Sequence, residues 1–264
     1  MKNNDADIII NSVDRAIDII EYLFEAKKPV PLTQISKNLN LYKSTVYRTL
    51  VTLQNRGYVS QNQETGNYCL GLKMLTLGSH ADPDIDIVSI VHPYMERLYR
   101  TFSETVNLSV LSHDSNRIYH SVVVDRINGQ NRLSSSITLG SLNECYSCSV
   151  GKCLLAFTPN IDLSIYETYP MVRHTKTTIT TVPELEKELE RVRHNRYALD
   201  AEEWEEGLFC IGAPILRNGV AVAAMSLSGP TARINDGRVQ HRIMFLRDLC
   251  QEISDELTSG KPQR

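Results

Sequence analysis

The chain has 264 residues, of which 42% are hydrophobic and 22% charged, and its formal net charge is −3. These values are typical of a globular protein of about two domains, and they exclude collagen-like, disordered and solenoid architectures. The longest wholly apolar run extends only from Val220 to Met225, and Met1 to Ile10 has no signal-peptide core. We therefore expect a cytoplasmic protein without a membrane segment, whose six cysteines stay reduced.

The charge is unevenly distributed. Between Lys27 and Lys73 there are seven basic residues and one acid, Glu64, so this segment carries +6 and the remainder −9. A basic segment inside an acidic protein indicates a surface for phosphate groups, although an ordinary solvated face gives a weaker form of the same pattern.

The first predicted element is a helix from Val13 to Glu25, capped by Ser12 and ended by Pro29 and Pro31. Its expected inward face consists of Val13, Ala16, Ile17, Ile20, Leu23 and Phe24.

Two short helices follow, Leu32–Leu39 and Lys43–Asn55, separated by a break at Asn40-Leu41. This pattern predicts a helix-turn-helix. Gly57 ends the second helix, and the segments 58–61 and 68–70 predict a β-hairpin that turns at Gly66-Asn67. Three helices and a hairpin form a winged helix-turn-helix.

The domain boundary is expected after the hairpin. A further helix is predicted at 72–79, a break at Ala81-Asp-Pro83, and a long amphipathic helix at Ile85–Phe102. The sequence therefore predicts a DNA-binding-type domain at 1–71, a linker helix at 72–84 and a second domain at 85–264.

The second domain is predicted to be α+β, with a mostly antiparallel sheet and flanking helices. A capping box at Thr181-x-x-Glu184 opens one of those helices. The expected strands are 106–112, 117–124, 132–137, 208–216 and 220–228, and the other expected helices are 150–157 and 236–257.

The second helix of the helix-turn-helix carries hydrogen-bond donors and methyl groups on its outward positions and no acids. Such side chains suit the edges of bases in the major groove and the phosphates beside them. An ordinary surface helix is the alternative, but the turn, the wing and the basic segment agree with DNA binding. The expected DNA-binding residues are Lys43, Ser44, Thr45, Tyr47, Arg48 and Thr52.

Several segments in order along the chain resemble one protein family. LYKSTVYRTLVTLQNRGYV at 41–59 and GNYCLGL at 66–72 resemble the DNA-binding domain of IclR-family bacterial transcriptional regulators. SVGKCLLA at 149–156, YALDAEEWEEGLFCIGAP at 197–214 and AAMSLSGP at 223–230 resemble that family's effector-domain signatures. The resemblance implies a GAF-like effector domain, a homodimer or dimer of dimers, and palindromic double-stranded DNA operators, with repression as the commoner mode.

A ligand site is expected in the second domain. The strand at 220–228 ends one of its faces with the hydroxyls of Ser226 and Ser228, which need partners from the backbone or from a ligand. The helix that begins near Ser147 or Ser149 can receive a carboxylate at its N-terminus. The resemblance implies a small organic acid, carboxylic or sugar, bound by Ser149, Val150, Asp200, Cys210, Ser226 and Ser228, with Arg132 and Ser135 less certain.

Two alternatives concern the cysteines. Cys145-x-x-Cys148 departs from the family pattern and, with Cys153 and a distant histidine, could bind a metal or act as a redox switch, although buried small hydrophobic residues fit better. An enzyme with Cys148 or Cys210 as nucleophile and a DNA-tethering module is the second alternative, but no histidine lies in a recognisable catalytic motif. The acidic run Asp200, Glu202, Glu203, Glu205 and Glu206 could hold carboxylate chemistry, but it is interpreted as a solvated loop. We expect no cofactor, no metal and no catalytic residue.

Overall fold

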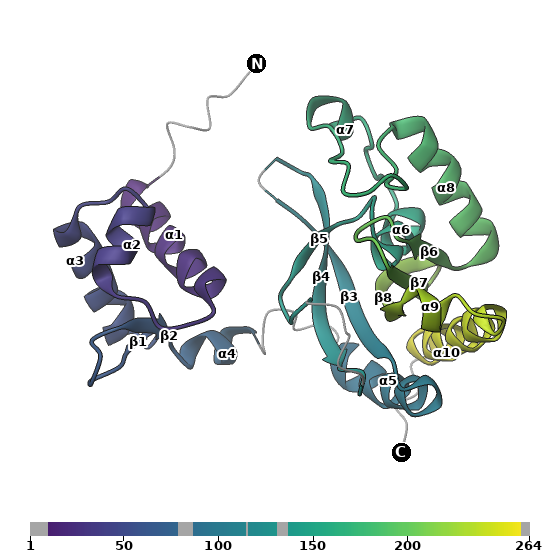
Figure 1. Cartoon of the computed structure of the whole chain (residues 1–264), viewed down its shortest axis with the longest axis horizontal. Coiled ribbons are helices and arrows are strands. Elements are labelled where there is room, and N and C mark those ends of the chain that lie inside the picture. Colours follow the sequence, from purple (N-terminus) through teal and green to yellow (C-terminus); the bar gives the residue numbers. More distant parts are fainter. Residues whose placement is uncertain (1–9, 79–86, 115, 131–136, 260–264) are drawn as a thin grey trace. The chain divides into compact units, whose positions relative to one another are not determined.

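The computed structural model describes residues 10–78, 87–114, 116–130 and 137–259. The chain divides into two compact units, Met1–Ile85 and Asp86–Arg264 (Figure 1). Within the described residues, no helix has both the length and the apolar character needed to span a membrane.

The first unit is a winged helix-turn-helix, as the sequence predicts. Its two strands are antiparallel, with Val59 paired to Leu70, and they form the wing. A small core around Ile19, Ile35 and Leu50 holds the helices together. The elements are α1 (Asn11–Ala26), α2 (Leu32–Asn38), α3 (Lys43–Asn55), β1 (Val59–Gln61), β2 (Tyr68–Leu70) and α4 (Lys73–Gly78).

Two expectations about α1 are wrong. The residue at the N-cap position is Ile10, which makes no side-chain cap, and Ser12 lies inside the helix. The core buries Ile19 and Leu23, whereas three members of the expected inward face are about half exposed. These are Val13 (53%), Ile17 (48%) and Phe24 (48%). The helix carries two apolar stripes, and helical spacing alone does not show which of them packs on its own domain.

The second unit is α+β, as predicted. One six-stranded sheet has the order β5-β4-β3-β8-β7-β6, and every neighbouring pair is antiparallel. The strands are β3 (Thr105–His113), β4 (Tyr119–Ile127), β5 (Leu142–Glu144), β6 (Ala198–Ala201), β7 (Leu208–Arg217) and β8 (Val220–Pro230). The helices are α5 (Ile87–Phe102), α6 (Ser149–Phe157), α7 (Ile165–Thr168), α8 (Val182–Asn195), α9 (Thr231–Ile234) and α10 (Val239–Ser259).

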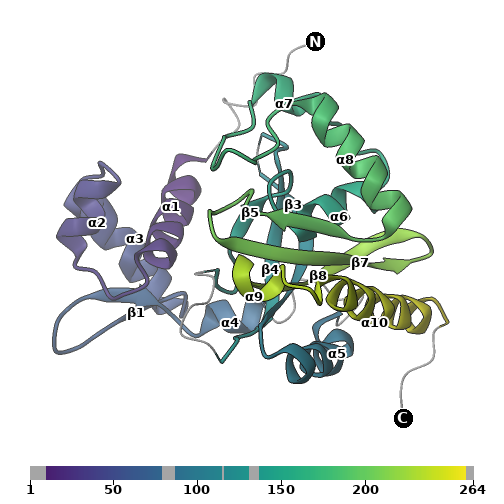
Figure 2. The same ribbon diagram turned by 45° about the vertical axis from the view of Figure 1, so that its right-hand side comes forward.

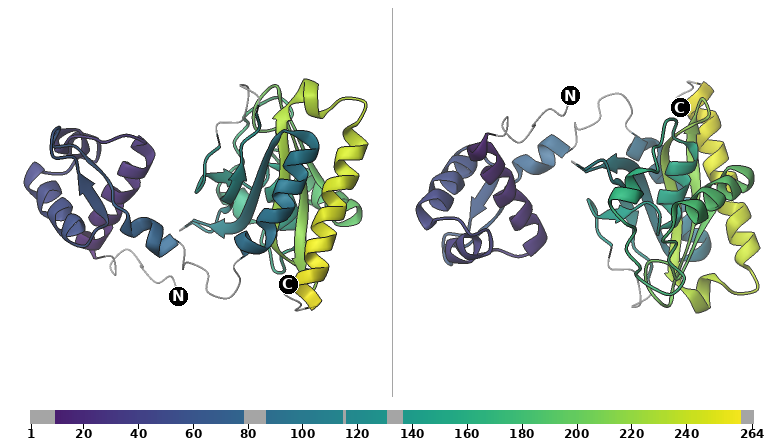
Figure 3. Two further views of the ribbon diagram at one scale, coloured as in Figure 1. Left: turned by 90° about the horizontal axis from the view of Figure 1, so that it is seen from below. Right: turned by 90° about the horizontal axis from the view of Figure 1, so that it is seen from above.

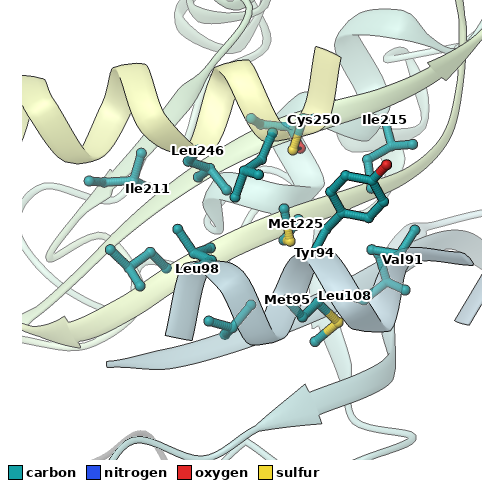
Figure 4. Close-up of a cluster of buried hydrophobic side chains, with 14 of the residues drawn as sticks. Val91, Tyr94, Met95, Leu98, Leu108, Ile211, Ile215, Met225, Leu246 and Cys250 are labelled. Atoms are coloured by element: carbon teal, nitrogen blue, oxygen red, sulfur yellow. Dashed lines mark hydrogen bonds between the residues drawn. The ribbon is translucent and has the colours of Figure 1, made fainter. Parts of the chain in front are cut away.

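Helices cover both faces of this sheet. The long helices α5 and α10 lie side by side on one face (Figure 3, left), where Met95, Leu98, Met225 and Leu246 pack together (Figure 4). On the opposite face α6 contacts β7 and β8, and α8 packs against α6 (Figure 2). From Ser149 to Ala156 every residue of α6 is buried. The helix α6 is therefore enclosed between the sheet and α8 along nearly its whole length.

The predicted helices and strands of the second unit are present to within a few residues, with one exception. The expected strand at 132–137 falls almost wholly on 131–136, which lie outside the described residues. Four short elements were not predicted: β5, β6, α7 and α9. Each has four residues or fewer, which is too short for the helical period or the strand alternation of apolar residues to be recognised.

Candidate functional site

The outward face of α3 holds the predicted DNA-binding residues. Val46 and Leu50 are fully buried and fix this helix against α1 and α2. The opposite side is left to solvent: Lys43, Ser44, Tyr47, Arg48 and Thr52 are exposed and Thr45 is half-buried.

The same face is basic and its cations are available. No ion pair of Lys43 or Arg48 occurs among the described residues, and α3 has no acidic residue of its own. A groove between α1 and α3 adds Arg15 beside Arg48. An exposed helix face with cations and hydroxyls has the chemistry that reads the major groove.

A cavity lies in the second unit, on the α6 side of the sheet. The space between the atoms there, open solvent included, is about 390 Å³. Its lining comes from β3, β4, β5, β6, β7, β8, the start of α6 and the segments beside them. The lining residues are Asn107, Ser109, Val123, Ile137, Asn143, Cys148, Ser149, Val150, Asp200, Trp204, Leu208, Cys210, Ser226 and Ser228.

Strand register explains why residues far apart in sequence meet there. Asp200 pairs with Cys210, and Cys210 pairs with Ser228, so these three form a row across β6, β7 and β8. In a neighbouring row, Gly212 pairs with Ser226, which pairs with Asn107 on β3.

Two glycines bring the start of α6 against this sheet. A Cβ atom on Gly212 would lie 2.8 Å from the carbonyl carbon of Ser149, and one on Gly151 would lie 2.4 Å from the Cα of Cys145. Real Cβ atoms do not approach backbone so closely, so only glycine permits this packing. The helix N-terminus is thereby held at the cavity wall.

The start of α6 is suited to an anion. The first N–H groups of a helix have no carbonyl partner within the helix, and the helix dipole is positive there. Cys148 occupies the N-cap position, and Ser149 and Val150 are the first two helical residues. Of the two expected starting residues, Ser147 and Ser149, the helix therefore begins at Ser149. The described lining residues include no lysine or arginine, so the positive potential comes from these backbone groups and from the buried Lys152, whose charge acts on Asp200 and Cys148.

Asp200 lies opposite as a buried carboxyl. Its Oδ1 accepts hydrogen bonds from the backbone N–H groups of Glu203 (2.8 Å) and Trp204 (3.3 Å). Burial nevertheless raises the pKa of Asp200 to about 6, because the charged form is poorly solvated there. Near neutral pH this group can accept, and when protonated also donate, a hydrogen bond to a ligand.

A buried ion pair supports the loop that carries Trp204. Lys152 is 0% exposed on α6, and its Nζ lies 2.6 Å from Oε1 of Glu203 and 3.7 Å from Oε1 of Glu188. Burial raises the pKa of Glu203 to about 7 even beside this cation. The prediction of a solvated acidic loop is therefore wrong for Asp200 and Glu203, which are buried, because Lys152 compensates them. A lysine inside an otherwise apolar helix was the available signal.

The cysteines are all free thiols. Burial raises the pKa of Cys148 to about 11 and that of Cys210 well above its usual range, so neither is a ready nucleophile at neutral pH. Among the described residues, no group of three His, Cys, Asp or Glu side chains is placed to hold a metal ion.

The structure brings all six expected effector-binding residues to this one cavity: Ser149, Val150, Asp200, Cys210, Ser226 and Ser228. Arg132 and Ser135 lie outside the described residues. Asn107, Ser109, Asn143 and Trp204 also line it and were not expected. The alternation of polar and apolar residues in β3 was the signal for the first two.

A winged helix-turn-helix and a separate domain with a small-molecule cavity define a DNA-binding regulator with an effector domain. Two family models match the chain, the IclR helix-turn-helix domain over residues 12–63 and the bacterial transcriptional regulator IclR C-terminal domain over residues 80–255. The chain belongs to the IclR family of bacterial transcriptional regulators.

Individual relatives agree. The transcriptional regulator KdgR of Escherichia coli K12 is 34% identical over 250 residues, covering 94% of this chain and 93% of that protein. The repressor AllR of the same strain is 31% identical, covering 93% and 90%. The crystal structure of Thermotoga maritima IclR superposes with a TM-score of 0.74 at 29% identity, covering 94% of this chain and 98% of that one.

A more distant solved structure contains a ligand. An IclR homologue from Microbacterium hydrocarbonoxydans, complexed with 4-hydroxybenzoate, has a TM-score of 0.80 at 20% identity and covers 93% of this chain and 98% of its own, which shows the shared fold. The matching models and these curated relatives are all transcriptional regulators, so the cysteine-enzyme alternative is set aside.

Proposed function

We propose that this protein is a repressor whose α3 binds operator DNA and whose affinity for that DNA is changed by a small organic acid bound in the cavity. The observation that carries the proposal is the meeting of a helix N-terminus, a carboxyl of raised pKa and two serine hydroxyls in one cavity. The relative AllR is named a repressor, and a homologue of the same fold was solved with an organic acid. Since its target is chromosomal DNA, we expect the protein to act in the cytoplasm.

The acid is expected to bind with its carboxylate toward Ser149 and Val150 at the start of α6. There the backbone N–H groups and helix dipole favour negative charge. Asp200, Ser226 and Ser228 face the rest of the molecule, with Cys210 packed beside them.

The DNA contacts are expected to come from Lys43, Ser44, Thr45, Tyr47, Arg48 and Thr52. Arg48, at the centre of the exposed face, is the strongest candidate for a base contact, because arginine pairs with two acceptors of guanine. The remaining hydroxyls and Lys43 suit phosphates, which position the helix.

A second copy of the chain is expected beside the first winged helix. Ile10, Val13, Ile17 and Phe24 form an exposed apolar stripe along α1, and Leu72 and Leu75 at the start of α4 are exposed as well. Such a stripe on a DNA-binding domain suits a symmetric partner, and two copies of one helix-turn-helix read a two-fold site. A homodimer, or a dimer of dimers, on a palindromic operator follows.

Footprinting on DNA selected from random duplexes tests the proposal. We expect a two-fold site whose half-sites are about 10 bp or a multiple apart, and a footprint that changes when an acid that raises the melting temperature is added. A short asymmetric footprint bound by a monomer contradicts the dimer. A footprint indifferent to every stabilising acid contradicts the effector role.

A further inference from the structure

We infer that the effector carries at least one hydroxyl group in addition to its carboxylate, and that this hydroxyl binds between Asn107 and Ser109 on β3. The inference rests on the proposed acid-binding role of the cavity. It concerns a part of the cavity wall separate from the α6 start, which we assign to the carboxylate.

Two side chains of β3 point into the cavity without complete hydrogen bonding. Asn107 is 3% exposed and Ser109 is 0% exposed, and both line the cavity. Oδ1 of Asn107 and Oγ of Ser109 have no hydrogen-bond partner in the described part of the chain. Leaving a buried polar atom unpaired costs about 1–3 kcal/mol, so such atoms are expected to meet a partner in the working protein.

The amide of Asn107 is only weakly held on its other side. Its Nδ2 donates to the hydroxyls of Ser226 and Ser228, each at 3.4 Å, and those two hydroxyls are also 3.4 Å apart. These distances are longer than the usual 2.7–3.2 Å. The three polar groups therefore form a loose cluster around one edge of the cavity.

The type of group that completes this cluster follows from its donors and acceptors. Oδ1 of Asn107 requires a donor, and the hydroxyl of Ser109 can either donate or accept. If the amide is turned by 180°, the serine hydroxyls can donate to its oxygen and its NH₂ group then lacks a partner. A hydroxyl satisfies either arrangement because it both donates and accepts, whereas a carboxylate only accepts.

Charge points the same way. The described lining has no lysine or arginine, and the cluster of Asn107, Ser109, Ser226 and Ser228 is uncharged. A second carboxylate at this edge would be buried against uncharged groups of the described lining, which is costly. The effector class is thus a hydroxylated monocarboxylic acid, such as a sugar acid, in preference to a simple aliphatic or dicarboxylic acid.

A water molecule is the competing occupant, since the site is polar and a small cavity of this kind can hold one. The two occupants differ in what they predict. A ligand hydroxyl makes binding selective for hydroxylated acids, and the selectivity then depends on Asn107 and Ser109. If a water molecule occupies this position, the affinity does not depend on whether the acid carries a hydroxyl, and Asn107 and Ser109 do not affect selectivity.

The test uses matched pairs of acids with the full-length protein. Thermal shift and titration calorimetry compare D-gluconate with hexanoate, 3-hydroxybutyrate with butyrate, and a panel of further sugar acids with their deoxygenated counterparts. We expect the tightest binder to be hydroxylated, with at least about tenfold higher affinity than its deoxygenated counterpart, because a site built around hydrogen bonds rejects a ligand that lacks them.

Two variants connect this selectivity to β3. Ser109→Ala and Asn107→Ala are each expected to lower the affinity ratio of the pair about tenfold or to abolish it. Ser254→Ala is the control: its buried hydroxyl accepts from the Leu216 N–H on the α10 side, so it lowers stability without changing the ratio. The ratio is the readout because a general loss of stability does not move it.

The outcomes separate this inference from the proposed function. If a deoxygenated acid binds as tightly as its hydroxylated partner, or if both β3 variants keep the wild-type ratio, the inference is wrong while the effector site stands. If no acid of either kind binds, the acid-binding role itself fails, and the inference fails with it.

Discussion

The two candidate sites are built in opposite ways. The recognition face of α3 is an exposed surface whose cations have no partners among the described residues, and its support is two buried apolar side chains, Val46 and Leu50. The cavity is an interior site whose polar groups are buried beside the sheet, and its support includes a buried ion pair between Lys152 and Glu203. The side chains of the first site lie in solvent, whereas most polar groups of the second are buried in the folded protein.

This difference determines how substitutions act. On the exposed face a long side chain such as that of Arg48 can be removed at little cost in stability, because it is exposed and its charge has no ion-pair partner among the described residues. In the cavity, binding and stability are linked, because each polar group that binds a ligand is also a buried group that needs a partner. The three predictions below test this contrast, in order of decreasing effect.

The largest effect is expected from Gly151→Ala. The added methyl group would meet the backbone of Cys145 at 2.4–2.9 Å, and backbone cannot move aside as a flexible side chain can. We expect the free energy of unfolding of the second unit to fall by about 3 kcal/mol, at the upper end for overpacking. Chemical denaturation measures it. Gly237→Ala is the matched control, since its Cβ would meet nothing within 4 Å, and an equal loss in both variants would refute the packing argument.

An intermediate effect is expected from Arg48→Ala. Loss of a base contact should weaken operator binding by about 1–3 kcal/mol and leave the unfolding transition unchanged. Fluorescence anisotropy on operator and scrambled duplexes gives both affinities, and Lys187→Ala on the exposed face of α8 is the control for a lost positive charge. Unchanged affinity for both duplexes would mean that α3 is not the recognition helix.

The smallest effect concerns pH. Burial raises the pKa of Asp200 from 3.8 to about 6 and that of Glu203 from 4.5 to about 7, so both bind protons more tightly in the folded state. Their stabilising contribution is complete below those ordinary values and is lost as the pH rises through about 6 and about 7. We expect the melting temperature to fall between about pH 4 and pH 7 and to change little above that range.

Asp200→Asn and Glu203→Gln should each flatten that pH dependence, because the neutral side chains no longer titrate. Glu190→Gln, at an exposed position of α8, is the control and should retain the wild-type slope. A slope that is identical in all four proteins would show that neither buried carboxyl has a raised pKa.

Much of the fold could be predicted from local patterns. Apolar spacing placed α2 and α3 to within a residue, and Thr181 caps α8 by accepting from the Glu184 N–H, as the capping box predicts. The buried face of α1 could not be predicted in this way. Its second stripe, with Val13 and Ile17, has the same period as the first, and only three-dimensional packing distinguishes them.

The cavity shows a similar limit. Ser226 and Ser228 stand out in the sequence because two hydroxyls interrupt an apolar strand. The alternation in β3 shows that Asn107 and Ser109 share one face, but that this face meets Ser226 and Ser228 follows only from the sheet order, in which β3 lies beside β8 although more than a hundred residues separate them. Lys152 and Glu203 likewise meet only through the folding of α6 against β6 and β7.

The central claim is that a ligand in the cavity changes DNA binding. Titration calorimetry of the tightest-binding acid, with and without operator, on the wild type and on Ser226→Ala/Ser228→Ala measures this directly. We predict that operator lowers the wild type's affinity for the acid, and that the acid lowers its affinity for operator by the same factor, a coupling of about 1–3 kcal/mol. The double variant should bind operator normally and lose the response. If it binds the acid normally and its operator binding still responds, the ligand acts elsewhere and the claim is contradicted.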